Sequence, residues 1–291
     1  MLTLIMTAVT LLKEWHKNSE INKNQRIAAR IQHDLDIVTH KTLTIRDYSL
    51  HYVSSSESTS LDQEKTPVIF VHGTPGSWGT FSRYFEEIPF ITDFKLYSID
   101  RPGWGASGYS GKKFPVSLSE QSTLIGPMLK RIWQDNGQQK MIIVGHSLGG
   151  SLVPKLAVDY PDYLKGVVVL AGDLDPILSE ARWFNYLLDW LPDSFLPDIW
   201  QNSNDEVLAI KSSLEGFQKE FASITMPINV LQGSEDSLVR PGSAVKAPAI
   251  FPSSDVNVTL LEGATHIINH THLEQVKAAI YEMEARSDTS K

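Results

Sequence analysis

Ser147 lies in a short segment whose residue types could support nucleophilic catalysis. An apolar run, Met141–Val144, predicts a buried strand, and it leads directly into Gly145-His146-Ser147-Leu148-Gly149, a G-x-S-x-G pattern. A helical pattern follows at once. A sharp turn from strand to helix strains the backbone of the central residue, so its neighbours must be small. The Ser147 hydroxyl would then be exposed at the positive end of a helix, where a negative charge is stabilised.

Two further residues could complete the requirements of a serine nucleophile. A serine hydroxyl reacts poorly at neutral pH, so it needs a base within hydrogen-bonding distance and a carboxylate that orients this base. Asp236 and His266 follow Ser147 in the chain and could supply the carboxylate and the base. The chemistry that these three residue types favour is attack on a carbonyl group.

Strands and helices are predicted to alternate along most of the chain. The runs that predict strands are Thr42–Ile45, Ser49–Val53, Pro67–Val71, Phe94–Ile99, Met141–Val144, Gly166–Leu170, Ile228–Leu231 and Val256–Leu261. This alternation predicts an α/β fold with a mainly parallel sheet and helices on both faces. In such sheets the ligand site lies at the carboxyl ends of the strands. The polar residues that lie just after the carboxyl ends of predicted strands are Thr74, Asp100, Ser147, Asp173, Asp236 and His266.

Four motifs together make this sequence resemble the α/β-hydrolase fold family. They are His72-Gly73-Thr74-Pro75-Gly76, Asp100-Arg101-Pro102-Gly103-Trp104-Gly105-Ala106-Ser107, the segment Gly145–Gly149, and Gly233-x-x-Asp236 with a later histidine. The resemblance covers residues 42–285 and is to the esterase- and lipase-like members with a serine nucleophile. It implies an eight-stranded, mainly parallel sheet, a short helical lid and a catalytic triad in the order serine, acid, histidine.

The resemblance implies a role for each matching position. These roles are Ser147 as the nucleophile, Asp236 as the triad acid, His266 as the base, and the backbone N–H groups of Thr74 and Leu148 as the oxyanion hole. The family usually has glycine before the histidine, whereas this chain has Thr265. We expect a more crowded site at that point but the same imidazole. The chemistry requires no metal and no organic cofactor.

Other residues compete for the roles of acid and base. They are Asp173 and Asp175 for the acid, and His270 and His272 for the base. Some members of the family place the acid one strand earlier, which keeps the first two in consideration. The Gly-x-x-Asp turn favours Asp236, and the position of the two later histidines at the start of a helix favours His266.

Three further features of the motifs have predicted structural roles. We expect His72 and His146 to hold loops in place by hydrogen bonding. We expect Asp100-Arg101 to fix a loop rather than to contact substrate. We also expect a cis peptide bond between Thr74 and Pro75, because this turn must direct an N–H group inward.

Residues 174–203 interrupt the alternation and are rich in aromatic side chains. Trp183, Phe184 and Leu187 recur at helical spacing there, and the resemblance places the lid of the fold at this point. Some of these side chains would form the core of the lid, and the others would cover an apolar pocket. This favours a carboxylic ester with a hydrophobic acyl or alcohol part as the substrate.

Several functions remain open on these residues. Serine at position 147, instead of the aspartate of related dehalogenases and epoxide hydrolases, implies an acyl-enzyme intermediate. The same residues would also serve a C–C bond hydrolase, a thioesterase, a lactonase, or an amidase or peptidase. A protein of another class, which binds a small ligand on this fold without catalysis, is a further alternative.

The composition excludes other classes of function. The net charge of −8 argues against a nucleic-acid partner, and the absence of cysteine excludes disulfides, thiol nucleophiles and cysteine-based zinc sites. The nine histidines are scattered, apart from the group His266, His270 and His272, so no metal site is predicted. The sequence predicts no particular oligomeric state.

The chain is expected to divide into three parts. Residues 1–41 form an N-terminal segment and connector, residues 42–173 and 204–291 form the hydrolase core, and residues 174–203 form the lid. The apolar run at residues 2–12 is shorter than the roughly 20 residues that cross a bilayer. It is interpreted as a membrane-surface anchor, a degenerate signal sequence or a helix packed on the core, so the location is either membrane-associated or cytoplasmic.

Overall fold

The computed structural model describes residues 38–45, 48–55, 65–109, 114–192 and 195–289. Within these ranges one sheet has the strand order β1-β2-β4-β3-β6-β7-β8-β9, and the short strand β5 pairs with β2 at the edge. The strands are β1 (Val38–Ile45), β2 (Tyr48–Ser55), β3 (Thr66–Val71), β4 (Phe94–Ile99), β5 (Gly108–Tyr109), β6 (Met141–His146), β7 (Leu164–Leu170), β8 (Ile228–Gly233) and β9 (Val256–Leu261). The predicted runs therefore form the eight main strands.

The sheet is antiparallel at one edge and parallel elsewhere. Strands β1, β2 and β4 pair antiparallel, whereas the pairs from β4 through β3, β6, β7 and β8 to β9 are all parallel. Every residue of β3, β4 and β6 is buried. Parallel strands covered on both faces require continuous apolar runs, which explains why these strands were predictable from the sequence.

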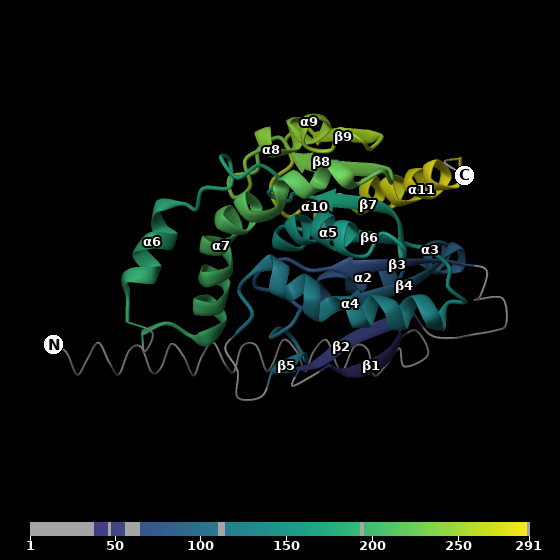
Figure 1. Ribbon diagram of the computed structural model, residues 1–291, viewed down its shortest axis with the longest axis horizontal. Helices are drawn as coiled ribbons and strands as arrows, with labels where there is room; N and C mark the ends of the chain where they lie inside the picture. Colours follow the sequence, from purple (N-terminus) through teal and green to yellow (C-terminus); the bar gives the residue numbers. More distant parts are fainter. Residues whose placement is uncertain (1–37, 46–47, 56–64, 110–113, 193–194, 290–291) are drawn as a thin grey trace.

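Helices cover both faces of the sheet and bury two separate apolar clusters (Figure 1). Helices α4 (Leu118–Asp135) and α5 (Leu148–Asp159) pack on the face that Ile143 contributes to, and α11 (Leu273–Thr289) packs on the face of Ile142 and Val144. Successive strand residues thus point into opposite clusters, as the pleat of a strand requires. The mainly parallel α/β architecture that the sequence predicts is confirmed.

Shorter helices connect the remaining strands. They are η2 (Trp78–Phe81), α2 (Ser82–Phe85), α3 (Ile88–Asp93), α8 (Gly242–Val245), α9 (Ala247–Ile250) and α10 (Ile268–Thr271). None of the helices in the described ranges is long and apolar enough to cross a membrane. The apolar segment at residues 2–12 lies outside the described residues.

The segment that the sequence assigns to the lid ends within a longer helix. Between β7 and β8 lie α6 (Trp183–Trp190), α7 (Asp198–Phe217) and the 3₁₀ helix η4 (Gln218–Ser223), and Figure 1 shows α6 and α7 side by side at one end of the molecule. The expected boundary at residue 203 falls inside α7, because no glycine or proline interrupts the chain there. Helix α7 therefore packs both against α6 in the lid and against α5 in the core.

The apolar cluster under α4 yields a stability prediction. Leu129 is fully buried in this cluster, so Leu129→Ala should lower the free energy of unfolding by about 2–5 kcal/mol. Leu260 on β9 is 48% exposed, and the same substitution there should cost less than about 1 kcal/mol. Urea denaturation of the two variants would measure the difference, and equal losses would contradict the assignment of the core.

Candidate active site

Ser147 adopts a strained backbone conformation at the junction of β6 and α5. Its φ is 56° and its ψ is −124°, in a region that residues with a side chain seldom occupy. The turn is tight because a Cβ atom on Gly145 would collide with the carbonyl of Gly149, and one on Gly149 with the carbonyl of Val71. The glycines of the G-x-S-x-G pattern are therefore required by contact between backbone segments.

The structure brings together the three side chains that the sequence singles out for the triad. His266 Nε2 lies 2.9 Å from Ser147 Oγ, and His266 Nδ1 lies 2.8 Å from Asp236 Oδ2. The other carboxylate oxygen, Oδ1, accepts hydrogen bonds from the backbone N–H groups of Leu238 and Val239, at 2.8 and 2.9 Å. These contacts allow His266 to accept the serine proton while Asp236 holds its tautomer.

The electrostatics of Asp236 suit the role of the acid. Burial alone would raise the pKa of this carboxyl group, but hydrogen bonds from His266 and from the two backbone N–H groups outweigh burial and keep the pKa below its usual value. The carboxylate is therefore ionised at neutral pH. An ionised carboxylate beside His266 stabilises the imidazolium that forms when the serine is deprotonated.

His146 supports the backbone of His266 and does not face the serine proton. Its Nε2–H donates to the carbonyl of His266 at 3.0 Å, and the two rings lie 5.0 Å apart. Burial, followed by repulsion from His266, lowers the pKa of His146 to about 3. A neutral imidazole in this place adds no charge next to the base, so the structure confirms that His146 holds a loop.

The competing acids and bases lie elsewhere. Asp175 pairs with Lys246 at 2.8 Å and accepts from the N–H groups of Ile177 and Leu178. His272 contacts the hydroxyl of Thr271. The two remaining competitors, Asp173 and His270, both line the pocket described below, but neither occupies the place between Ser147 and Asp236 that His266 fills.

The loop between β3 and η2 lies against the nucleophile. A Cβ atom on Gly73 would lie 2.7 Å from the Cβ of Ser147, so only glycine allows this approach. The Thr74–Pro75 peptide bond is cis, as expected. Leu148 is the first residue of α5, so its N–H has no acceptor within the helix. Thr74 and Leu148 therefore both border Ser147, as an oxyanion hole would require.

Arg101 fixes this loop from behind. Its Nε and Nη2 donate to the carbonyls of His72 and Gly73, each at 2.9 Å, and its backbone N–H donates to His72 Nε2 at 3.0 Å. The other ring nitrogen of His72 donates to the carbonyl of Gly73 at 2.7 Å. Burial, and then the charge of Arg101, hold the pKa of His72 well below its usual value. The predicted structural roles of Arg101 and His72 are confirmed.

Asp100 holds the neighbouring turn. Its carboxylate accepts hydrogen bonds from the backbone N–H groups of Trp78 and Ala106, at 2.6 and 2.8 Å, and contacts His51 Nδ1 at 2.8 Å. The side chain is almost fully buried and lies away from Ser147. Asp100 therefore fixes a loop, as the sequence predicts, and does not enter the pocket.

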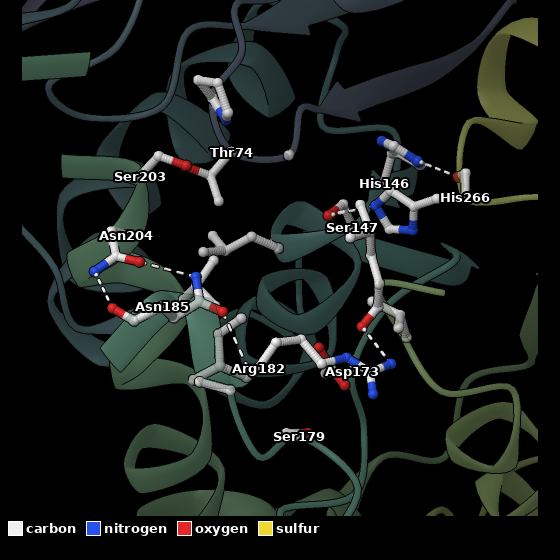
Figure 2. Close-up of a pocket in the computed structure, with 18 of the residues that line it drawn as sticks. Thr74, His146, Ser147, Asp173, Ser179, Arg182, Asn185, Ser203, Asn204 and His266 are labelled. Atoms are coloured by element: carbon white, nitrogen blue, oxygen red, sulfur yellow. Dashed lines mark hydrogen bonds between the residues drawn. The ribbon is translucent and has the colours of Figure 1, made fainter. Parts of the chain in front are cut away.

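A cavity of about 730 Å³ opens in front of Ser147, between the core and the lid. Figure 2 shows Ser147 and His266 on one side of this pocket and Asn185 and Asn204 on the other. Much of the wall is apolar, and the apolar residues that α6 and α7 contribute to it are Phe184, Leu188, Trp200, Val207 and Ile210. Asn185 Nδ2 donates to Asn204 Oδ1 at 2.8 Å, which joins α6 to α7 beside the cavity.

Of the three lid residues that the sequence singles out, one is among the residues that line this pocket. Phe184 lines the pocket, but Trp183 and Leu187 do not; they are 76% and 50% exposed. Helical spacing places Trp183 and Leu187 on one face of α6, and Phe184 and Leu188 on the adjacent face. The spacing does not determine which of these two faces points into the pocket. The sequence also gave no role to Glu206, although an acidic residue in phase with the buried Ile210 and Leu214 of α7 is a detectable signal.

Comparisons with known proteins agree with this fold and site. A sequence model of the alpha/beta hydrolase fold matches residues 66–199. A 2-hydroxy-6-oxononadienedioate/2-hydroxy-6-oxononatrienedioate hydrolase from Cupriavidus pinatubonensis is 22% identical over 269 residues, covering 79% of this chain and 90% of that protein. This protein therefore has the α/β-hydrolase fold, and it is similar in sequence to hydrolases that share this fold.

Solved structures show the same fold. A candidate lipase from Acinetobacter baumannii gives a TM-score of 0.65 at 18% identity, covering 91% of this chain and 97% of that chain. A membrane phospholipase A described as a bacterial virulence factor gives a TM-score of 0.63 at 15% identity and covers 99% of both chains. At these identities the structural likeness extends to the arrangement of the elements alone.

Asp173, which lines the pocket, makes the free energy of unfolding of the protein depend on pH. Burial raises its pKa to about 6, against hydrogen bonding from Ser179 and the positive charge of Arg240. Because the folded pKa is raised, the folded state loses stability as pH rises from about 4 to 6. Asp173→Asn removes this loss. The change in the free energy of unfolding from pH 4 to pH 8 should therefore be about 2–3 kcal/mol more favourable in the variant than in wild type. Denaturation of both proteins at both pH values would measure it.

Asp175 provides a control with the opposite sign. Hydrogen bonding and the charge of Lys246 outweigh burial and lower the pKa of Asp175, so its contribution to stability is present above the usual aspartate pKa and is lost as pH falls. Asp175→Asn should destabilise the protein at pH 8 and have less effect in acid. If Asp173→Asn also lost stability at pH 8, its carboxylate would not be destabilised in the folded state.

Proposed function

We propose that this protein is a serine hydrolase that cleaves a carboxylic ester, with a hydrophobic acyl or alcohol part, through an acyl-Ser147 intermediate. The observation that carries the proposal is the 2.9 Å contact between Ser147 Oγ and His266 Nε2 at the base of a largely apolar cavity. A protein that only binds a ligand has no need of an activated serine. The site therefore favours catalysis over simple binding.

The proposed reaction has two steps. Ser147 Oγ attacks the ester carbonyl while His266 Nε2 takes its proton, and the N–H groups of Thr74 and Leu148 stabilise the tetrahedral oxyanion. His266 then gives the proton to the leaving alcohol, and the acyl group stays on Ser147. A water molecule deprotonated by His266 hydrolyses this acyl-enzyme, and Asp236 stabilises the imidazolium in both steps.

The pocket supports a substrate with a long apolar part. The apolar side chains of α6 and α7 form the wall opposite Ser147, so burying an acyl or alkyl chain there would be favourable. Two structural relatives are named as a lipase and a phospholipase A, which hydrolyse esters of this chemical class. The substrate is therefore a small molecule with an apolar chain, with the scissile carbonyl at Ser147.

A C–C bond hydrolase is the second candidate. The relative from Cupriavidus pinatubonensis is named for a dienedioate, whose two carboxylates would need cationic partners. Arg182 and Arg240 both line the pocket, and the buried Nε of Arg182 has no acceptor among the described residues. Its Nη2 donates to the carbonyl of Ser237 at 2.7 Å. The Nε–H of Arg182 remains available to a substrate, which favours an anionic group on the substrate whichever bond is cleaved.

Hydrolysis of p-nitrophenyl esters from acetyl to palmitoyl tests the ester proposal. We expect turnover with an optimum at medium or long chains, and Ser147→Ala should lower kcat by about 10⁴-fold or more. Ser151→Ala is the matched control, because Ser151 lies one turn further along α5 and its buried hydroxyl has no partner in the described structure. It should leave kcat within about twofold of wild type.

Other outcomes separate the two candidates. Turnover of a 2-hydroxy-6-oxodienedioate without turnover of any ester would favour C–C bond cleavage. Failure of a fluorophosphonate to label Ser147 in the folded protein, together with no turnover of either substrate, would reject the serine-hydrolase proposal.

A further inference from the structure

We propose that Glu206, on lid helix α7, is a positioning residue for the oxyanion hole and acts through Arg101. This inference rests on the proposed function, because it concerns the N–H group of Thr74 that would stabilise the oxyanion. Glu206 lies in the lid, and sequence motifs of the core do not include it. The structure joins it to the loop beside Ser147 by a short chain of buried hydrogen bonds.

The first link is a fully buried ion pair. Arg101 Nη1 lies 2.6 Å from Glu206 Oε1, Arg101 Nη2 lies 3.1 Å from Oε2, and both side chains are 0% exposed. Gln121 Nε2 and Trp104 Nε1 also donate to Oε1, at 2.8 and 3.1 Å. A guanidinium paired at both oxygens has a fixed orientation, and water cannot replace a lost partner at this depth.

The second link runs from the same guanidinium to the loop. The Nη2 atom that contacts Glu206 also donates to the carbonyl of Gly73 at 2.9 Å, and Nε donates to the carbonyl of His72 at 2.9 Å. Arg101 therefore helps to hold both carbonyls, and His72 Nδ1–H, which donates to the carbonyl of Gly73 at 2.7 Å, holds that carbonyl with it. Glu206 sets the orientation of Arg101 from the lid side.

The third link is a single peptide group. The carbonyl of Gly73 and the N–H of Thr74 belong to the same planar unit, and in a trans peptide they point in opposite directions. A donor on the carbonyl therefore aims the N–H away from Arg101, toward the side on which Ser147 lies. It also polarises this N–H and makes it a stronger donor. Gly73 itself lies against Ser147, since a Cβ atom added to Gly73 would lie 2.7 Å from the Cβ and 3.3 Å from the Oγ of Ser147.

These links predict a specific kinetic effect. Loss of the Glu206 charge leaves Arg101 buried without its ion pair, and the guanidinium will turn toward other acceptors. The Thr74 N–H then no longer points at the position of the oxyanion, which exists only in the transition state. The expected result is a lower kcat with little change in KM, because the pocket that binds the ground state keeps its apolar walls.

The test compares Glu206→Gln with Glu215→Gln. Glu215 is exposed on the same helix, so the control makes the same chemical change away from Arg101. The assay uses the best p-nitrophenyl ester of the wild-type enzyme, with active sites counted by complete fluorophosphonate labelling. Glu206→Gln should lower kcat per labelled site by about 10-fold or more and change KM by less than about threefold, and Glu215→Gln should match wild type.

A transition-state analogue separates positioning from folding. A trifluoromethyl ketone forms a tetrahedral adduct with the serine, and its oxygen occupies the oxyanion hole. Its affinity should fall by the same factor as kcat in Glu206→Gln, whereas a purely structural role would change the number of labelled sites and leave both values per site unchanged. If Glu206→Gln cannot be purified, Glu206→Asp against Glu215→Asp is decisive, with an expected loss of at least threefold per site.

The outcomes distinguish this inference from the proposed function. If the wild-type enzyme neither hydrolyses esters nor reacts with fluorophosphonate, the proposed function itself fails. If the wild-type enzyme is active and the Glu206 variants equal the Glu215 variants in kcat per site and in affinity for the ketone, the positioning role of Glu206 is overturned.

Discussion

The strained turn at Ser147 is the constraint around which the site is built. A residue with a side chain at φ 56° and ψ −124° persists only when its surroundings prevent relaxation. Backbone from β3, β6 and α5 meets here with no space for a Cβ on Gly145 or Gly149. The buried central strands supply the rigidity, since their ladders and apolar faces leave the turn no alternative conformation. The position of the nucleophile is thus determined by the core of the protein.

The titratable residues around His266 have different pKa values because their surroundings differ. Asp236 has enough hydrogen-bond donors to remain ionised despite burial, whereas the pKa of His146 is so low that it remains neutral. For Asp173, burial outweighs the hydrogen bond from Ser179 and the charge of Arg240 and raises the pKa. The two carboxyl groups therefore differ in pKa, and His266 contacts Asp236, the one whose ionised form its hydrogen-bond donors stabilise. This is the condition under which an imidazole works as a base at neutral pH.

Much of the fold and the elbow was predictable from the sequence, because both depend on local patterns. Continuous apolar runs mark strands that are buried on both faces, and the glycines around Ser147 mark a sharp turn. The orientation of α6 was not predictable, since the apolar residues of this helix occupy more than one face. The partnership of Arg101 with Glu206 depends on the approach of elements far apart in the chain, which local patterns do not encode.

The lid contacts two different loops of the core, and this limits how the lid can vary among related proteins. Arg182 at the start of α6 donates to the carbonyl of Ser237, next to Asp236, while Glu206 pairs with Arg101 behind the opposite loop. Inserting one residue within α7 ahead of Glu206 would rotate its side chain by about 100° and separate the pair. The connection between α6 and α7 lies between these two contacts, so a change of length there leaves Arg182 at the start of α6 and Glu206 within α7. Diversification of the pocket by insertion at that connection, whether in nature or by design, is compatible with both contacts.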